Sequence, residues 1–195
     1  MSVAIPAFPP PKLDAAQACG AGGGSSDPAV NASGDLQISN LLQALGAISG
    51  ELPEVIYSSD LQRALTTAQR IVTHFSSRLC VDPHLREIDF GQWEALHWEQ
   101  IEQRDPIHAQ QWLEEYPNQP APCGEPIDSF EDRVLHAFDT IASLNGRSAV
   151  VTHAGVLRVI LTRRCSVTDE DAGLQTKEYC SFFHYPLREV LHDRE

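Results

Sequence analysis

The chain has 195 residues, of which 42% are hydrophobic and 21% are charged, and these proportions are ordinary for a single globular domain. Its 27 acidic and 14 basic residues give a net charge of −13, which argues against binding to nucleic acid or to an anionic membrane, because both need a basic surface. No apolar run approaches the roughly 18 residues of a membrane span, and the N-terminal segment is unlike a signal peptide, so we expect a cytoplasmic protein.

The first 34 residues differ in composition from the rest of the chain. Residues 2–5 are typical of a short strand, whereas the three prolines at 9–11 and the glycine-rich run at 20–24 exclude a helix or a central strand. We therefore expect one long loop over residues 6–34.

Apolar strands and amphipathic helices alternate through the remainder. Asn31 or Ser33 is predicted to cap the first helix. Apolar spacing predicts helices near residues 38–48, 61–75, 130–144 and 156–161, and strands over residues 54–58, 79–81 and 148–152. Residues 92–126 combine helical pieces with a proline-rich loop, and residues 179–192 predict a closing hairpin that turns at Pro186. This alternation predicts an α/β sandwich, with a single domain over residues 1–195.

The cysteines are widely scattered and contain no C-x-x-C pair. They predict free thiols in a reducing compartment, and neither a disulfide framework nor a zinc site. We expect no metal and no cofactor. The five cysteines are Cys19, Cys80, Cys123, Cys165 and Cys180.

Two junctions between a strand and a helix are candidates for a ligand site, because ligands of open α/β sheets bind beyond the carboxyl ends of the strands. One is residues 58–63, which contain Arg63, and the other is residues 152–155, which contain His153. A guanidinium and an imidazole that meet at a helix N-terminus suit a phosphate. By spacing alone, Arg63 also fits a solvent-exposed arginine, and His153 also fits an ordinary capping or core histidine.

Four segments, taken in chain order, resemble successive motifs of the histidine phosphatase superfamily. They are SSDLQRALTTA (58–68), LREIDFGQWE (85–94), PCGE (122–125) and VVTHAGVLR (150–158). The chain is similar in particular to the alpha-ribazole phosphatases of cobalamin synthesis, over about residues 27–193. The resemblance implies a three-layer α/β/α sandwich of the phosphoglycerate-mutase-like type with a mostly parallel central sheet. It also implies phosphomonoester hydrolysis with a small phosphorylated molecule as the partner.

The resemblance also implies roles for individual residues. Arg63 matches a phosphate-binding arginine, and His153 matches the second active-site histidine, which binds the phosphate. Glu87 matches the acid that protonates the leaving oxygen, a role that suits a carboxyl group in a partly desolvated pocket. Ala154 and Gly155 would bring the backbone close to the ligand. Ala95 stands where the family usually has glycine.

The family's first strand ends in Arg-His-Gly or Arg-His-Pro, and that histidine accepts the phosphoryl group. This chain has Ala7-Phe8 there, or Ala18-Cys19 in an alignment that shortens the loop and removes the first strand; we prefer Ala7-Phe8. No histidine precedes His74. We therefore expect a catalytically impaired or inactive member, a pseudoenzyme that binds a small phosphorylated ligand. The alternatives are an active phosphomonoesterase that uses Cys19 or His153 as nucleophile, and a partner-binding domain without a ligand.

Overall fold

The computed structural model describes the following residues: 2–5, 27, 29–47, 53–115, 119–144, 146–176, 180 and 183–186. The strands are β1 (Ser2–Ile5), β2 (Val55–Ser58), β3 (Arg78–Val81), β4 (Ser148–Val151) and β5 (Phe183–Pro186). The helices are α1 (Ala32–Ala47), α2 (Gln62–Phe75), α3 (Trp98–Arg104), α4 (Pro106–Glu115), α5 (Ile127–Ser143), α6 (Ala154–Arg164) and α7 (Asp169–Gln175), with short 3-10 turns η1 (Pro83–Leu85) and η2 (Gly91–Trp93).

The central sheet is parallel, in the order β3-β2-β4. Ile56 of β2 lies in register with Leu79 of β3 and with Ala149 of β4. Strand β1 pairs with β5 in an antiparallel ladder and lies beside β4. Because β2, β3 and β4 run in the same direction, their carboxyl ends meet at one edge of the sheet, where the predicted site residues follow.

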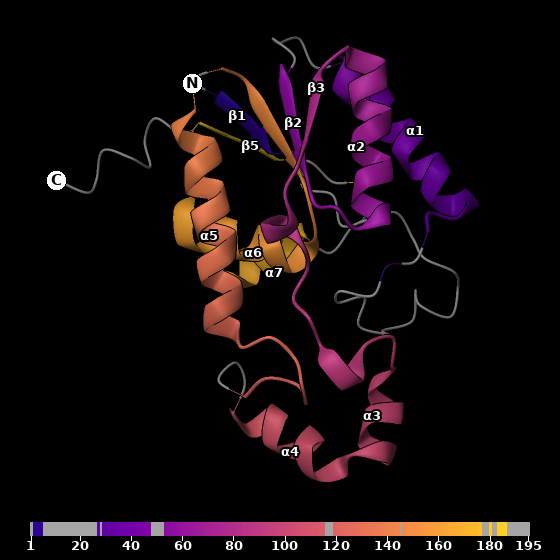
Figure 1. Ribbon diagram of the computed structural model, residues 1–195, viewed down its shortest axis with the longest axis vertical. Coiled ribbons are helices and arrows are strands. Elements are labelled where there is room, and N and C mark those ends of the chain that lie inside the picture. The colour runs from indigo at the N-terminus through magenta and orange to yellow at the C-terminus, as the bar shows by residue number, and fades with distance from the viewer. Residues whose placement is uncertain are drawn as a thin grey trace, which may run out of the picture.

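Helices cover both faces of the sheet: α1 and α2 lie on one side and α5 and α6 on the other (Figure 1). Successive strand residues point to opposite faces. Ile56 and Val151 therefore pack with α1 and α2, while Tyr57 and Val150 pack with α5 and α6. All four residues of β4 are buried, as expected for a central parallel strand. The three-layer α/β/α fold with a parallel sheet is confirmed.

Several element boundaries differ from expectation. The predicted loop over residues 6–34 ends earlier, because α1 begins at Ala32. Asn31 rather than Ser33 caps this helix: its Oδ1 accepts a hydrogen bond from Gly34 N at 2.9 Å. Helix α5 begins three residues early, at Ile127, and α7 was not predicted at all, because its polar sequence has little apolar spacing.

The predicted hairpin turn at Pro186 is wrong. Pro186 is the last residue of β5 and pairs with Ser2 of β1. Proline is tolerated at the end of a strand, where a missing N–H costs little. The rest of the expected hairpin, residues 189–192, lies outside the described residues, as do residues 6–26 of the expected loop.

Helices α3 and α4 form a unit at one end of the molecule with a small core of its own (Figure 1). Three tryptophans make this core, with ring centroids between 5.9 and 6.3 Å apart: Trp93, Trp98 and Trp112. Ala95, which precedes α3, has a φ of +59°, in the left-handed region that glycine adopts without strain. None of the helices in the described ranges is long and apolar enough to cross a membrane.

Candidate functional site

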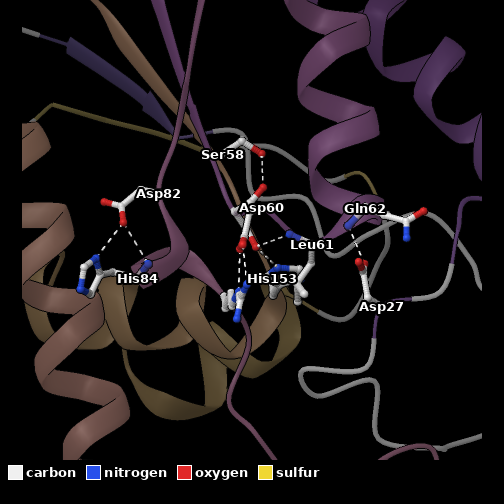
Figure 2. A network of polar contacts seen from close by, with 10 residues as sticks. Asp27, Ser58, Asp60, Leu61, Gln62, Asp82, His84 and His153 are labelled. Carbon is white, nitrogen blue, oxygen red and sulfur yellow. Dashed lines mark hydrogen bonds and ion pairs between the residues drawn. The ribbon is translucent and has the colours of Figure 1, made fainter.

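The carboxyl ends of β2 and β4 carry a buried polar cluster. Ser58 ends β2 and Ser59 follows it, and Thr152 and His153 follow β4; all four side chains are fully buried. Because β2 and β4 are neighbours in the sheet, these residues meet at the same edge, where Figure 2 shows Ser58 and His153. The hydroxyls of Ser58 and Thr152 donate to backbone carbonyls, so His153 is the member of this cluster with a buried polar atom that lacks a partner among the described residues.

His153 is held through one ring nitrogen. Its Nε2 lies 2.9 Å from Ser59 Oγ. The Ser59 oxygen also accepts a hydrogen bond from Leu61 N at 3.3 Å, and towards Nε2 the hydroxyl is the donor in one tautomer of the ring and the acceptor in the other. If Ser59 donates to Nε2, the single proton of the neutral imidazole sits on Nδ1.

The other ring nitrogen of His153 is buried and has no hydrogen-bond partner within the described ranges. Burial lowers the pKa of His153 well below its usual 6.5, and the positive charges of Arg63 and Arg133 lower it further. The ring is therefore neutral at physiological pH, and in the tautomer in which Ser59 donates to Nε2 it presents a buried Nδ1–H donor without a partner among the described residues. Such a donor is suited to an anionic oxygen.

Arg63 lies in the first turn of α2 with only 1% of its surface exposed. Its positive charge acts to lower the pKa of both His153 and Glu87, although burial raises the pKa of Glu87 overall. The three side chains therefore lie close enough to interact electrostatically. A guanidinium stays charged at any physiological pH, so the buried Arg63 gives this edge of the sheet a fixed positive charge.

Glu87 follows the turn η1 and reaches the N-terminus of α6. Its Oε2 accepts a hydrogen bond from Gly155 N at 3.0 Å, and its Oε1 accepts one from Ile88 N at 3.1 Å. Burial raises the pKa of Glu87, whereas these two N–H groups and the charges of Arg63 and Arg158 oppose the rise. Burial has the largest effect, so the carboxyl group holds its proton to a higher pH than an exposed glutamate does.

Gly155 approaches the Glu87 carboxylate rather than being left for a ligand. A Cβ at position 155 would overlap Glu87 Oε1, and the Gly155 N–H is already bonded to that side chain. At the other helix N-terminus, Asp27 accepts a hydrogen bond from Gln62 N at 2.5 Å (Figure 2). Carboxylates therefore occupy main-chain donors of both α2 and α6.

A cleft of about 900 Å³ opens beside Glu87 and Ala154 and runs along α6 towards α5 and α7. Aromatic rings of Phe90, Trp112 and Phe130 form part of its wall. Neither Arg63 nor His153 lines it. Glu87 thus lines an open cleft that is large enough for a small organic group, and it also feels the charge of the buried Arg63.

The charge of Arg63 acts on both Glu87 and His153, and Ala154 directly follows His153, so the predicted residues lie near one edge of the sheet, but only Glu87 and Ala154 line the cleft. Their chemical roles remain predictions. Sequence reasoning did not single out Ser59 or Asp27, although Ser59 stands in the SSDLQRALTTA motif. The two candidate nucleophile positions, Ala7-Phe8 and Ala18-Cys19, lie outside the described residues.

No group of three or more histidine, cysteine, aspartate or glutamate side chains in the described ranges could hold a metal ion. The four cysteines in those ranges, Cys80, Cys123, Cys165 and Cys180, are free thiols. Burial raises the pKa of Cys165 to about 11 and that of Cys180 to about 12, so neither thiol is ionised at neutral pH.

Comparison with known proteins identifies the family to which this chain belongs. The sequence profile of the histidine phosphatase superfamily (branch 1) matches residues 15–184. The chain belongs to this superfamily.

Among its relatives is a metal-independent phosphoserine phosphatase from Arabidopsis thaliana, 35% identical over 117 residues that cover 58% of this chain and 49% of the relative. Another is the adenosylcobalamin/alpha-ribazole phosphatase of Escherichia coli K12, 27% identical over 136 residues, covering 69% of this chain and 66% of the relative. The chain thus spans about half the length of the plant relative and two thirds of the bacterial one. The crystal structure of the alpha-ribazole phosphatase from Shigella flexneri superposes with a TM-score of 0.81 at 22% identity, covering 94% of this chain and 89% of the other. The expected phosphoglycerate-mutase-like architecture is confirmed.

Proposed function

We propose that this chain binds a small phosphorylated molecule at the carboxyl ends of β2 and β4, and that it is impaired or inactive as a phosphatase. The observation that carries the proposal is the buried Nδ1 of His153, which has no hydrogen-bond partner among the described residues and lies within the influence of the Arg63 charge. A phosphoryl oxygen would accept the Nδ1–H bond while the guanidinium balances its charge. The phosphate-binding roles of Arg63, His153 and Ala154 belong to this proposal.

The organic part of the ligand would extend past Glu87 and Ala154 into the cleft. In this pose the Glu87 carboxyl group stands beside the ester oxygen. A carboxyl group whose pKa is raised by burial can donate its proton to a departing alkoxide. These residues would hold a phosphomonoester and assist its cleavage, but none of them accepts the phosphoryl group.

The proposed impairment rests on the sequence. The family resemblance requires an Arg-His pair at the end of the first strand, and the chain has Ala7-Phe8 or Ala18-Cys19 instead. His153 is a poor substitute nucleophile, because Ser59 occupies Nε2 and the proton occupies Nδ1. Loss of a catalytic nucleophile can cost on the order of 10⁶ in kcat.

Calorimetric titration with sulfate tests the binding site, because sulfate keeps two negative charges across the neutral range. We expect His153→Gln to weaken sulfate binding by about 10- to 150-fold, the loss of one charge-assisted hydrogen bond worth about 1.5–3 kcal/mol. His136→Gln is the control, since His136 is exposed on α5. A neutral imidazole still carries one N–H, so His153 can donate a hydrogen bond without a positive charge. The affinity for sulfate should therefore stay constant from about pH 6.5 to 8.5, whereas a site that needs an imidazolium would lose about tenfold in affinity for each unit of rising pH.

A chromogenic phosphate ester tests the catalytic part. We expect no turnover by the unmodified chain above background. Robust turnover that Cys19→Ala abolishes would favour the active phosphomonoesterase. A folded chain that binds neither sulfate nor phosphate would favour the partner-binding domain.

A further inference from the structure

Arg133 of α5 uses all five N–H groups of its guanidinium within the described part of the chain. Its Nε and Nη2 donate to the two carboxylate oxygens of Glu125, at 2.6 and 2.8 Å. Its Nη1 donates to the carbonyl oxygens of His84 and Arg86, at 2.7 and 2.8 Å, and Nη2 also donates to the Glu87 carbonyl at 3.1 Å. The guanidinium also lies 4.9 Å from the centre of the Phe130 ring.

The three carbonyl acceptors belong to one short segment, residues 84–87, which carries Glu87. This segment follows β3 and has no sheet partner in the described structure. Two further side chains bind its backbone: Thr152 Oγ1, after the end of β4, donates to Leu85 O at 2.6 Å, and Asp82 Oδ1 accepts a hydrogen bond from His84 N at 2.9 Å. Arg133 therefore supplies most of the side-chain hydrogen bonds that fix the backbone of Glu87 relative to α5.

We propose that Arg133 is the positioning residue for Glu87: by binding three carbonyl groups of residues 84–87, it holds the carboxyl group against the N-terminus of α6 and at the edge of the cleft. The inference deepens the proposed function, on which it rests for the role of Glu87 as a proton donor. Nothing in it requires Arg133 to touch the ligand.

Arg133 acts on Glu87 through geometry rather than charge. Its charge is paired with Glu125, and the charged groups that act on the Glu87 carboxyl are Arg63 and Arg158. The charge of Arg133 does act on His153. Lysine at position 133 would keep that charge, but its single ammonium nitrogen cannot reach the Glu125 carboxylate and three separate carbonyls at once.

The test is an NMR titration of the Glu87 carboxyl group in the ligand-free protein, together with the chemical shift of the Gly155 amide. In Arg133→Lys, the pKa of Glu87 should fall towards its ordinary value, because the loosened carboxyl group reaches water. The Gly155 amide should lose the shift that its bond to Glu87 produces. Sulfate affinity should stay within about twofold of wild type, since Arg63 and His153 are untouched.

Arg164→Lys is the matched control. Arg164 of α6 forms a two-bond pair with Asp139 of α5, at 2.7 Å each, so this variant weakens a comparable guanidinium–carboxylate pair on α5 without touching residues 84–87. It should leave the Glu87 titration unchanged. If Arg133→Lys does not fold, Glu125→Gln serves instead: it weakens one side of the Arg133 network and should also lower the pKa of Glu87.

An unchanged Glu87 titration and Gly155 amide in a folded Arg133→Lys protein would overturn the inference, as would an equal change in Arg164→Lys. Failure of the proposed function would be seen in a different measurement: the wild-type chain would not bind sulfate. The Glu87 titration is measured in the ligand-free protein and does not depend on that result.

Discussion

Ser59→Ala tests how the site holds the proton of His153. The change removes the 2.9 Å contact to Nε2 and the longer 3.3 Å bond from Leu61 N, and it leaves both groups buried. The longer bond contributes less, so the unsatisfied imidazole nitrogen sets the cost, about 1–3 kcal/mol in the free energy of unfolding. Sulfate affinity should fall about five- to tenfold, since roughly 1 kcal/mol of ring orientation is lost.

Ser58→Ala is the control, because Ser58 is equally buried but its hydroxyl donates to the Ser59 carbonyl at 2.8 Å and does not contact His153. It should cost about 0.5–1.5 kcal/mol and leave sulfate binding unchanged. Urea unfolding measures the stability, calorimetry measures the affinity, and long-range nitrogen–proton NMR of the imidazole reports which nitrogen of His153 is protonated. Equal losses of affinity in both variants, or an Nε2-protonated ring in the wild type, would refute the assignment of the Nδ1 proton.

Three further predictions concern stability and are measured by urea unfolding. Because burial raises the pKa of Glu87, folding disfavours its charged form. Glu87→Gln should therefore be more stable than wild type at neutral pH, and it should lose that advantage below the ordinary pKa of 4.5, where the carboxyl group is protonated in the folded and the unfolded chain alike. A stability difference that does not depend on pH would contradict this. Gly155→Ala should cost about 1–3 kcal/mol by displacing Glu87, whereas Gly173→Ala, which meets nothing within 4 Å on α7, should be neutral or stabilising by up to about 1 kcal/mol. Ala95→Gly should stabilise by about 1 kcal/mol, because it relieves a positive φ; a loss of stability would show that Ala95 is unstrained.

The fold was predictable wherever burial of one or both faces of an element sets the spacing of its apolar residues. Strand β4 is apolar at nearly every position because both of its faces are covered, and α2 has one apolar stripe because one face is buried. Helix α7 lacked such a signal: its surface is mostly polar, and its N-terminus depends on Thr168, whose side chain accepts a hydrogen bond from Asp171 N. Pro186 was misread because a proline at a strand end looks the same in sequence as a proline in a turn.

The residues expected to contact the ligand could be predicted from the sequence. The residues that position those side chains could not. Arg63, Glu87 and His153 follow from four motifs and from the rule that strand ends converge. The partner of His153 could not be read from spacing, because Ser59 lies 94 residues away and only the pairing of β2 with β4 brings the two together. The same holds for Arg133, which lies 46 residues from Glu87 and is an ordinary helix residue in the sequence.

The last prediction concerns which position of this chain corresponds to the family's nucleophile, and two observations point to different positions. Strand β1 ends at Ile5 and lies beside β4, whose carboxyl end carries His153, which favours Ala7-Phe8. The superfamily match begins at residue 15, which includes Ala18-Cys19 and leaves out Ala7-Phe8. Restoring an Arg-His pair at each position in turn separates the two alignments.

We expect Ala7→Arg with Phe8→His to produce measurable hydrolysis of a chromogenic phosphate ester, and Ala18→Arg with Cys19→His to produce none. Phe8→His alone should recover little, because a new nucleophile without a second guanidinium leaves the phosphate poorly held, and groups that act as a unit are not additive. In the active double variant, Glu87→Gln should lower kcat more than it raises KM, because the acid acts on the leaving oxygen in the transition state. Activity from the Ala18/Cys19 pair would reverse the alignment. Two folded, sulfate-binding but inert double variants would mean that the site has lost more than its nucleophile and one arginine.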